Sequence, residues 1–413
     1  MKRKDREFVQ KARAAARSDQ TFQAIERLVD PFLTPNGNNL VYILPQTSRI
    51  GHFVFELHML ETLFKPTFDR IIVITEPMTK SGTNPWVRNL FGDYYRFVET
   101  DDQSIHFVGI LRREGVVNME QFKLLLWTPQ QAHVELFRRL SAGTAPAVLK
   151  PSDEMVSRAL IDLKTHSFDI NQPFVLLHIR TEKYLEGASQ HLHRLSSPEI
   201  YGPVVESLIK KNFQVVRIGE PDIKIGYKGK GYFDRSCWKQ SGGYLDLVLA
   251  SRCAFAVMQD SGIGWVPNSM GRKVIRLNCP HVYVNYNYMD DPTLFKIYRN
   301  KGSPDFLSFP QIISGELPLL INKQQIEAAA VDLLEHDSET LIAAVDEMWD
   351  YLNGRVVPNP THRLRKRALG RILQNRMERM PEWGGRGLGF YGMAHEKGWV
   401  SSAILLGQPN FWG

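Results

Sequence analysis

Short apolar runs alternate with helical patterns between about Phe174 and Asn278, and this rhythm constrains the fold more than any other feature. Strands are expected at 174–179, 214–218, 254–258 and 273–277, and helices at 198–211, 244–250 and 262–270. Mostly apolar strands with a helix after each are typical of a parallel sheet covered on both faces. Ligands of such sheets bind at the carboxyl ends of the strands. The segment is therefore predicted to be a doubly wound domain with a ligand site at that edge.

The first half of the chain repeats this rhythm, with expected strands at 39–45 and 70–75 and an amphipathic helix at 51–64. The 413 residues are too many for one core, because a domain takes about 100–200 residues. We expect an α/β protein with two Rossmann-like doubly wound domains and a cleft between them. The predicted parts are an N-terminal domain at 1–150, a C-terminal domain at 151–350 and a helical tail at 351–413 that packs back on the domains. Residues 322–351 are expected to be helical, with Asp337 and Ser338 resembling caps.

The net charge of +7 comes largely from the two ends of the chain. Residues 361–380 hold seven Arg or Lys and one Glu, which indicates either a solvated helix face or a basic surface for an anionic membrane. No zinc-finger, RNA-binding or helix-turn-helix pattern occurs, so nucleic acid is not an expected partner. The three cysteines lack paired spacing, and no apolar run approaches the roughly 20 residues of a membrane span. We expect a cytoplasmic protein, peripheral to the inner membrane face if the basic helix binds lipid.

His178 and Arg180 come at the end of the strand expected at 174–179, and strand alternation puts them on one face. Arginine suits phosphate because its planar fork makes two parallel charge-assisted hydrogen bonds. Lys183 and Tyr184 follow closely and are candidates for the same site. The alternative for Arg180 is a structural salt bridge to a carboxylate.

The turn around Asp260, Ser261 and Gly262 lies between an expected strand and an expected helix. Backbone N–H groups in such a turn can approach an anion, and the helix dipole favours negative charge. The alternative is a turn that merely reverses the chain. In the same sheet as Arg180, the turn predicts a cradle for a diphosphate.

Arg217 and Gly219 come at the end of the strand expected at 214–218, and Asp246 lies in the helix before the strand expected at 254–258. Arg217 either contacts the nucleotide or pairs with a carboxylate, and Gly219 allows close backbone approach. Asp246 either caps its helix or binds a ribose hydroxyl.

In the first half, Gly51 precedes His52 and Glu56, which are four residues apart and therefore on one helix face. An imidazole or carboxylate there could remove a proton from a hydroxyl. The alternative for Glu56 is a solvated helix carboxylate. His58 and Glu61 are expected at the surface.

The sequence has no Asp-x-Asp pair at a strand end, no phosphate loop of the Gly-x-x-x-x-Gly-Lys type and no Gly-x-Gly-x-x-Gly after a strand. These absences disfavour ATPases and dinucleotide dehydrogenases. We expect no metal and no cofactor, and a nucleotide diphosphate sugar, such as a GDP- or UDP-sugar, as co-substrate.

Five motifs together resemble a family of bacterial glycosyltransferases found in surface-polysaccharide and secondary-metabolite gene clusters. They are RIGHFVFELHMLETL (49–63), LLHIRTEKYL (176–185), HRLSSPEIY (193–201), VVRIGEP (215–221) and GGYLDLVLASRCAFAVMQDSGIGWVP (242–267). The resemblance covers residues 39–352. The LDL…DSG part is similar to heptosyltransferases, and HIRTEK is similar to the His-x-Arg element of fucosyltransferases. All these enzymes have the GT-B architecture and no required metal.

The resemblance implies an inverting, metal-independent sugar transfer to a small-molecule, glycan or lipid-linked acceptor. It implies that Arg180 and the amides of Ser261 and Gly262 hold the donor diphosphate and that Glu56, or otherwise His52, is the base. Further contacts to donor or acceptor are expected from Arg49, Gly51, Arg194 and Asp246. Leu195 stands where the family usually has Asn, which bears on the role of the Arg194 loop. The alternatives are a nucleotide-sugar 2-epimerase of the same fold and a non-catalytic nucleotide- or polysaccharide-binding protein.

Overall fold

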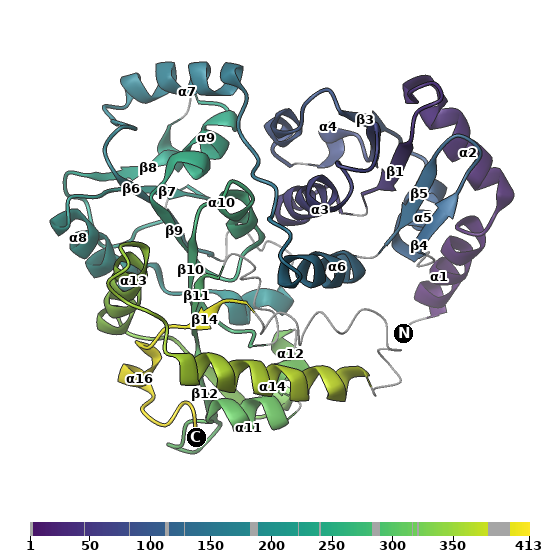
Figure 1. Ribbon diagram of the computed structural model, residues 1–413. Coiled ribbons are helices and arrows are strands. Elements are labelled where there is room, and N and C mark those ends of the chain that lie inside the picture. The colour runs from purple at the N-terminus through teal and green to yellow at the C-terminus, as the bar shows by residue number, and fades with distance from the viewer. Residues whose placement is uncertain are drawn as a thin grey trace. The chain divides into compact units, whose positions relative to one another are not determined.

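The chain forms two compact units, Met1–Ser152 and Asp153–Gly413. The computed structural model describes residues 3–44, 46–81, 83–111, 115–127, 129–181, 189–221, 223–238, 241–282, 290–315, 317–319, 322–378 and 397–413. Each unit has a sheet of mainly parallel strands with helices packed on it (Figure 1), which confirms the predicted α/β class with two Rossmann-like sheets. Within the described ranges, no helix is long and apolar enough to cross a bilayer.

The first unit is built on a five-stranded sheet in the order β3-β2-β1-β5-β4. Its strands are β1 (Asn39–Ile43), β2 (Arg70–Thr75), β3 (Tyr95–Glu99), β4 (Gly115–Asn118) and β5 (Lys123–Leu126). Its helices are α1 (Arg3–Ala15), α2 (Asp19–Val29), α3 (Ile50–Leu63), α4 (Met78–Ser81), α5 (Gln103–Leu111) and α6 (Pro129–Ser141). All neighbouring strands are parallel except β4 and β5, which are antiparallel.

Strand alternation divides the core of this unit between two faces. Val41 and Ile43 of β1 join an apolar cluster that includes Ile25 of α2 and Val108 of α5. Tyr42 points to the opposite face, where its hydroxyl reaches α3. The sheet therefore holds α3 on the face away from α2 and α5.

The second unit has a seven-stranded, fully parallel sheet in the order β14-β11-β10-β9-β6-β7-β8. Its strands are β6 (Phe174–His178), β7 (Gln214–Ile218), β8 (Tyr232–Asp234), β9 (Phe255–Met258), β10 (Val274–Cys279), β11 (Pro292–Phe295) and β14 (Trp399–Val400). Its main helices are α7 (Asp153–Thr165), α8 (Gly202–Lys210), α9 (Tyr244–Arg252), α10 (Trp265–Ser269) and α13 (Ser338–Leu352). Helix α7 packs on α9, and α8 packs on α13, on opposite sides of the sheet (Figure 1).

A smaller layer lies beside this sheet, and it corrects one prediction. It contains α11 (Phe309–Ser314), α12 (Lys323–Ala328), α14 (Pro360–Glu378) and α16 (Ile404–Gly407), and the antiparallel pair of β12 (Ile297–Asn300) and β13 (Val331–Leu334). The segment 322–351, expected to be helical throughout, is therefore interrupted by a strand. Ala330 has φ 51°, a left-handed conformation that ends α12, and the apolar residues that follow pair with β12. Asp337 does cap α13, since its carboxylate accepts the Thr340 N–H at 2.8 Å.

His58 and Glu61, expected at the surface, are buried or nearly buried in α3. His58 is fully buried, and its Nε2 lies 2.7 Å from the Ala147 carbonyl oxygen, so Nε2 carries the ring proton. Glu61 pairs with Lys65, and its side chain is 14% exposed. The expectation was wrong because α6 also packs on α3 and because Glu61 interacts with Tyr95 of β3. Burial lowers the pKa of His58 from 6.5 to about 4.

Acidification is expected to destabilise the first unit through His58. Between pH 6.5 and about pH 4 the unfolded chain binds a proton at this residue that the folded unit does not bind. The stability that His58 contributes is complete above pH 6.5, and about 2 kcal/mol of it is lost between pH 6.5 and pH 5. His58→Gln keeps a donor for the Ala147 carbonyl and removes the titration. Urea unfolding midpoints are therefore expected to fall less in the variant between pH 7.5 and pH 5, and equal falls would contradict this account.

Candidate functional site

The carboxyl ends of four parallel strands, β6, β7, β9 and β10, meet at one edge of the second sheet. The residues just after these strands include Arg180, Gly219, Asp260 and His281. The candidate site lies at this edge, where ligands of open α/β sheets bind.

Gln259 joins the ends of β6 and β9. It is fully buried, its Oε1 accepts the Arg180 backbone N–H at 2.7 Å, and its Nε2 donates to the Tyr201 hydroxyl at 3.0 Å. These bonds fix the backbone of Arg180 before any ligand arrives. The sequence placed Gln259 next to the predicted turn but gave no sign of this positioning role.

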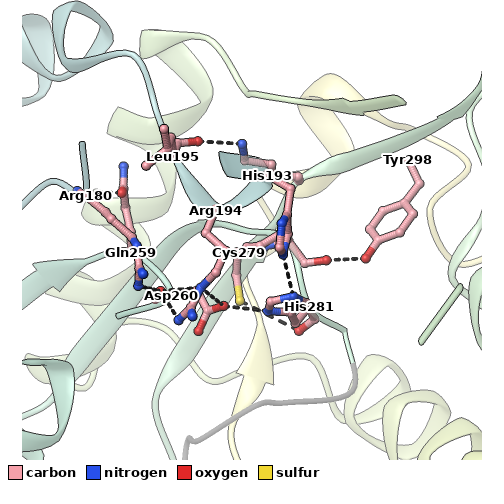
Figure 2. A network of polar contacts seen from close by, with 11 residues as sticks. Arg180, His193, Arg194, Leu195, Gln259, Asp260, Cys279, His281 and Tyr298 are labelled. Carbon is pink, nitrogen blue, oxygen red and sulfur yellow. Dashed lines mark hydrogen bonds and ion pairs between the residues drawn. The ribbon is translucent and has the colours of Figure 1, made fainter. Parts of the chain in front are cut away.

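Asp260 is the centre of a cationic cluster (Figure 2). Its carbonyl oxygen accepts hydrogen bonds from Arg194 Nε and Nη2, at 3.1 and 2.6 Å, and from Arg180 Nη1, at 3.4 Å. Its carboxylate Oδ2 lies 3.1 Å from Arg194 Nε and 2.6 Å from His281 Nδ1. Burial favours the neutral acid, but Arg194, His281 and Arg180 together hold the Asp260 pKa far below its ordinary value. The carboxylate is turned toward these protein groups, so in this structure Asp260 positions two arginines and a histidine.

Arg180 and Arg217 both act on the His178 imidazole. His178 is buried, and burial together with Arg180 and Arg217 lowers its pKa from 6.5 to about 3. The imidazole is therefore neutral at physiological pH. Gly219 lies against it with φ 116°, and a Cβ there would come 3.2 Å from His178 Cδ2. The group that closely approaches the Gly219 backbone is thus the His178 ring of the protein itself.

Arg217 and Asp246 both have protein partners. Arg217 is fully buried and donates from Nε and Nη2 to the Asp234 carboxylate, at 3.2, 2.7 and 2.8 Å. Asp246 lies in the first turn of α9, with Oδ1 3.1 Å from Arg235 Nε. Of the two alternatives for Arg217, the structure contains the pair with a carboxylate. A direct contact with a nucleotide would require the Arg217 side chain to rearrange. That contact stays a prediction.

The turn after β9 differs in detail from the expected cradle. The Ser261 N–H donates to the Gln259 carbonyl at 2.7 Å, so this amide is engaged within the turn. Ser261 and Gly262 are half-buried, and the expected helix begins as a 3-10 turn at Gly262–Gly264 before α10. The short α10 offers little dipole, so the arginines carry most of the positive charge here. Lys183 and Tyr184 lie outside the described residues.

A cavity of about 880 Å³ opens beside the cationic cluster. Thr181 and His193 lie in its wall, and Leu192 and Ile326 contribute apolar surface. A volume of about 300–1,000 Å³ with apolar walls and a few polar groups is typical of small-molecule sites. The sequence did not predict this cavity, because its walls come from segments far apart in the chain.

Lys296 and Glu335 fix one wall of the cavity. Lys296 Nζ donates to the Leu195 carbonyl at 2.7 Å and lies 3.6 Å from Glu335 Oε1. Glu335 in turn accepts the Ser197 N–H at 3.0 Å. The loop after Arg194 is thus held by two charged side chains. At Leu195 the held group is the backbone carbonyl, which any residue at that position would supply.

In the first unit, Glu56 is buried between two partners, so the alternative of a solvated carboxylate is wrong. Tyr42 donates its hydroxyl to Oε2 of Glu56, and His52 Nδ1 lies 3.1 Å from Oε1. Glu56 is fully buried, whereas the His52 side chain is 32% exposed. Burial first, and then the charge and hydrogen bond of Glu56, raise the Tyr42 pKa, so the phenol remains the donor. With Nδ1 donating to Glu56, the lone pair of the His52 ring lies on Nε2.

Arg49 and Gly51 lie next to the hydrogen-bonded pair of His52 and Glu56, which is called the dyad below. Arg49 is the exposed N-cap of α3, with extended backbone at φ −112°, and Gly51 is buried in the first turn. Their contact with an acceptor or donor stays a prediction. Across the residues that the structure describes, no group of three or more His, Cys, Asp or Glu could hold a metal ion.

No known family profile matches the chain, and no curated protein matches it. Among solved structures, it is similar to a glycosyl transferase family 9 protein from Veillonella parvula, with 11% identity over 58% of this chain and 80% of that one and a TM-score of 0.41. It is similar to the ADP-heptose LPS heptosyltransferase II of E. coli, with 15% identity, coverage of 58% and 84% and a TM-score of 0.37. The iron-containing glycosyltransferase TibC of enterotoxigenic E. coli has 12% identity, coverage of 71% and 75% and a TM-score of 0.34. These values are too low to assign a family, so function must be argued from the site itself.

Proposed function

We propose that the protein is a glycosyltransferase that moves a sugar, of the hexosyl or deoxyhexosyl type, from a nucleotide diphosphate sugar to a hydroxyl or amine acceptor. One observation carries the proposal. Two guanidinium groups, of Arg180 and Arg194, are fixed around Asp260 at the strand ends of a parallel sheet, beside a cavity of about 880 Å³. A fixed cationic pair next to a roomy, partly apolar cavity suits a ligand with a diphosphate and an organic group.

In this proposal the diphosphate binds at Arg180 and Arg194, with the Ser261 hydroxyl and the Gly262 amide as further donors from the turn. The nucleoside occupies the cavity, where Thr181 offers a hydroxyl and Leu192 an apolar surface. Uracil and guanine are the bases that we expect. Charge-assisted hydrogen bonds from arginine give such a site both affinity and orientation.

The proposed chemical step is an inverting displacement. His52 Nε2 removes the proton of the acceptor hydroxyl as its oxygen bonds to C1 of the sugar. The bond from C1 to the diphosphate oxygen breaks, and its electron pair leaves with the nucleotide diphosphate. Glu56 stabilises the imidazolium that forms, and the arginines stabilise the charge that develops on the leaving group. Glu56 thus acts as the positioning residue and His52 as the base.

A 2-epimerase of the same fold is the nearest rival, and it needs several carboxylates around the sugar. In the described part of the second unit, three acidic side chains are already paired with arginines. Asp260 pairs with Arg194, Asp234 with Arg217, and Asp246 with Arg235. This pairing favours transfer over epimerisation.

The proposal is tested by calorimetric titration of the full chain with UDP, GDP, ADP and CMP, followed by a mass-spectrometric screen for sugar-nucleotide hydrolysis. Binding of at least one nucleoside diphosphate and release of its sugar are expected. Absence of binding by all four would exclude the transferase and would favour a non-catalytic protein whose basic helix binds membrane or polysaccharide.

Arg180→Ala is expected to weaken the binding of the nucleoside diphosphate by roughly 10- to 150-fold, since a charge-assisted hydrogen bond contributes about 1.5–3 kcal/mol. Arg355→Ala is the matched control, because Arg355 is an exposed arginine that pairs with Asp350 on the surface. Calorimetry on both variants measures the difference. Equal affinities would remove Arg180 from the site.

A further inference from the structure

A chain of hydrogen-bonding side chains runs from buried Asp260 to the wall of the cavity. His281 Nδ1 lies 2.6 Å from Asp260 Oδ2, and His281 Nε2 lies 2.9 Å from His193 Nε2 (Figure 2). His193 itself lines the cavity. Neither histidine was among the predicted site residues, because their contact joins segments 88 residues apart.

The protons in this chain can be assigned from its chemistry. Asp260 is ionised, so its carboxylate only accepts, and His281 Nδ1 must carry a proton. In the neutral pair, His281 Nε2 then has a lone pair and accepts from His193 Nε2–H. His193 Nδ1 has no proton in that state. One additional proton converts His193 into an imidazolium whose Nδ1–H is a donor.

We propose that His193 takes up this additional proton when the nucleotide diphosphate sugar binds, and that its positive charge stabilises the bound diphosphate. The inference rests on the proposed function, because it names a third cationic group for the same anion. Asp260 links these groups, since its carbonyl and carboxylate hold Arg180, Arg194 and His281, and His281 contacts His193. An anion in the site and the Asp260 charge behind the histidines both favour the protonated pair.

Charged groups of both signs surround His193. They are Arg194 on its own turn, Arg180, Asp260 and His281 at the strand ends, Lys296 after β11, Lys323 and Glu327 on α12, and Glu335 after β13. Besides His281 these are four cations and three anions, and Asp260 is the anion hydrogen-bonded to the histidine pair. A bound diphosphate changes this balance by adding negative charge, so binding raises the proton affinity of His193 and takes up a proton.

The test is calorimetric titration of the full chain with GDP and UDP at pH 6, 7 and 8, in two buffers of different ionisation enthalpy. The buffer dependence gives the number of protons taken up on binding. Up to one proton more is expected for the wild type than for His193→Gln with the same ligand. The wild-type Kd is expected to rise by as much as tenfold per pH unit as the pair loses its proton, and the variant is expected to lack this component.

Two further variants make the comparison specific. His281→Asn keeps a donor toward Asp260 but removes the ring nitrogen that pairs with His193, so it is expected to lose the same proton uptake. This variant carries the comparison if His193→Gln does not fold. His166→Gln alters a histidine that stacks on Trp238 away from the chain, and it is expected to behave as the wild type.

The outcomes separate this inference from the function on which it rests. If neither GDP nor UDP binds the wild type, this inference fails, and the transferase proposal fails with it only if ADP and CMP do not bind either. If a nucleotide binds, but the wild type, His193→Gln and His281→Asn take up equal numbers of protons, the role of His193 is overturned and the transferase proposal stands.

Discussion

Replacing His52 with alanine is expected to lower turnover by about 10²- to 10⁴-fold and to leave the affinity for the nucleoside diphosphate unchanged. The reason is that the two residues of the His52–Glu56 pair differ in burial. Glu56 is fully buried and bonded to Tyr42 and His52, whereas the His52 side chain is 32% exposed. A base must reach the proton that it removes, and His52 is the member of the dyad that solvent reaches.

Glu56→Gln is expected to reduce turnover as well, for a different reason. An amide at this position can present an N–H to His52 Nδ1, which favours the tautomer with the proton on Nε2 and removes the lone pair that the base needs. Its pH–rate profile is expected to lose the limb that reports His52. His106→Gln is the control, because His106 is a buried histidine of the same unit that bonds the Thr100 carbonyl.

Steady-state kinetics and calorimetry on these three variants decide between the two possible bases. If His52→Ala turns over normally and Glu56→Gln does not, Glu56 is the base, as the sequence resemblance implied. If both turn over normally, the base lies elsewhere and the first-unit site has another role.

Much of the fold was predictable because its signals are local. The strand at Arg70–Thr75 and the strand at Gln214–Ile218 were predicted to the residue, since a short apolar run between polar residues marks a buried parallel strand. Strand β13 was missed because a segment of four residues with two leucines is compatible with a helix as well as with a strand. Only its pairing with β12, more than thirty residues away, distinguishes the two.

The site was predictable where chemistry follows a strand end, and unpredictable where a partner comes from elsewhere. Arg180 and Asp260 were placed correctly at one sheet edge by their position after β6 and β9. The role of Asp260 depends on Arg194, 66 residues away, and on His281, 21 residues away. No local pattern encodes these contacts. The depth of Glu56 was missed for the same reason, because α3 is covered by both the sheet and α6.

Asp234→Ala is expected to destabilise the second unit by about 3–5 kcal/mol, because it leaves the fully buried guanidinium of Arg217 without its carboxylate. The remaining acceptors of Arg217 Nη2 are neutral oxygens, the Ser236 hydroxyl at 2.7 Å and the Glu220 carbonyl at 2.8 Å. They can accept hydrogen bonds, but they carry no net charge to compensate the cation. Urea unfolding followed by tryptophan fluorescence measures the loss.

Asp346→Ala is the matched control, because it removes an aspartate from an ion pair with Lys211 in which both side chains are more than a third exposed. Exposed pairs contribute about 0–1 kcal/mol, so a small change is expected. If Asp234→Ala costs as little as the control, Arg217 is not held by this pair, and it becomes available to a nucleotide as the sequence also allowed. A large loss instead makes Arg217 a structural cation that acts on the site through the field it imposes on His178. The unfolding experiment therefore decides which of two roles a single arginine has, without requiring the ligand to be known.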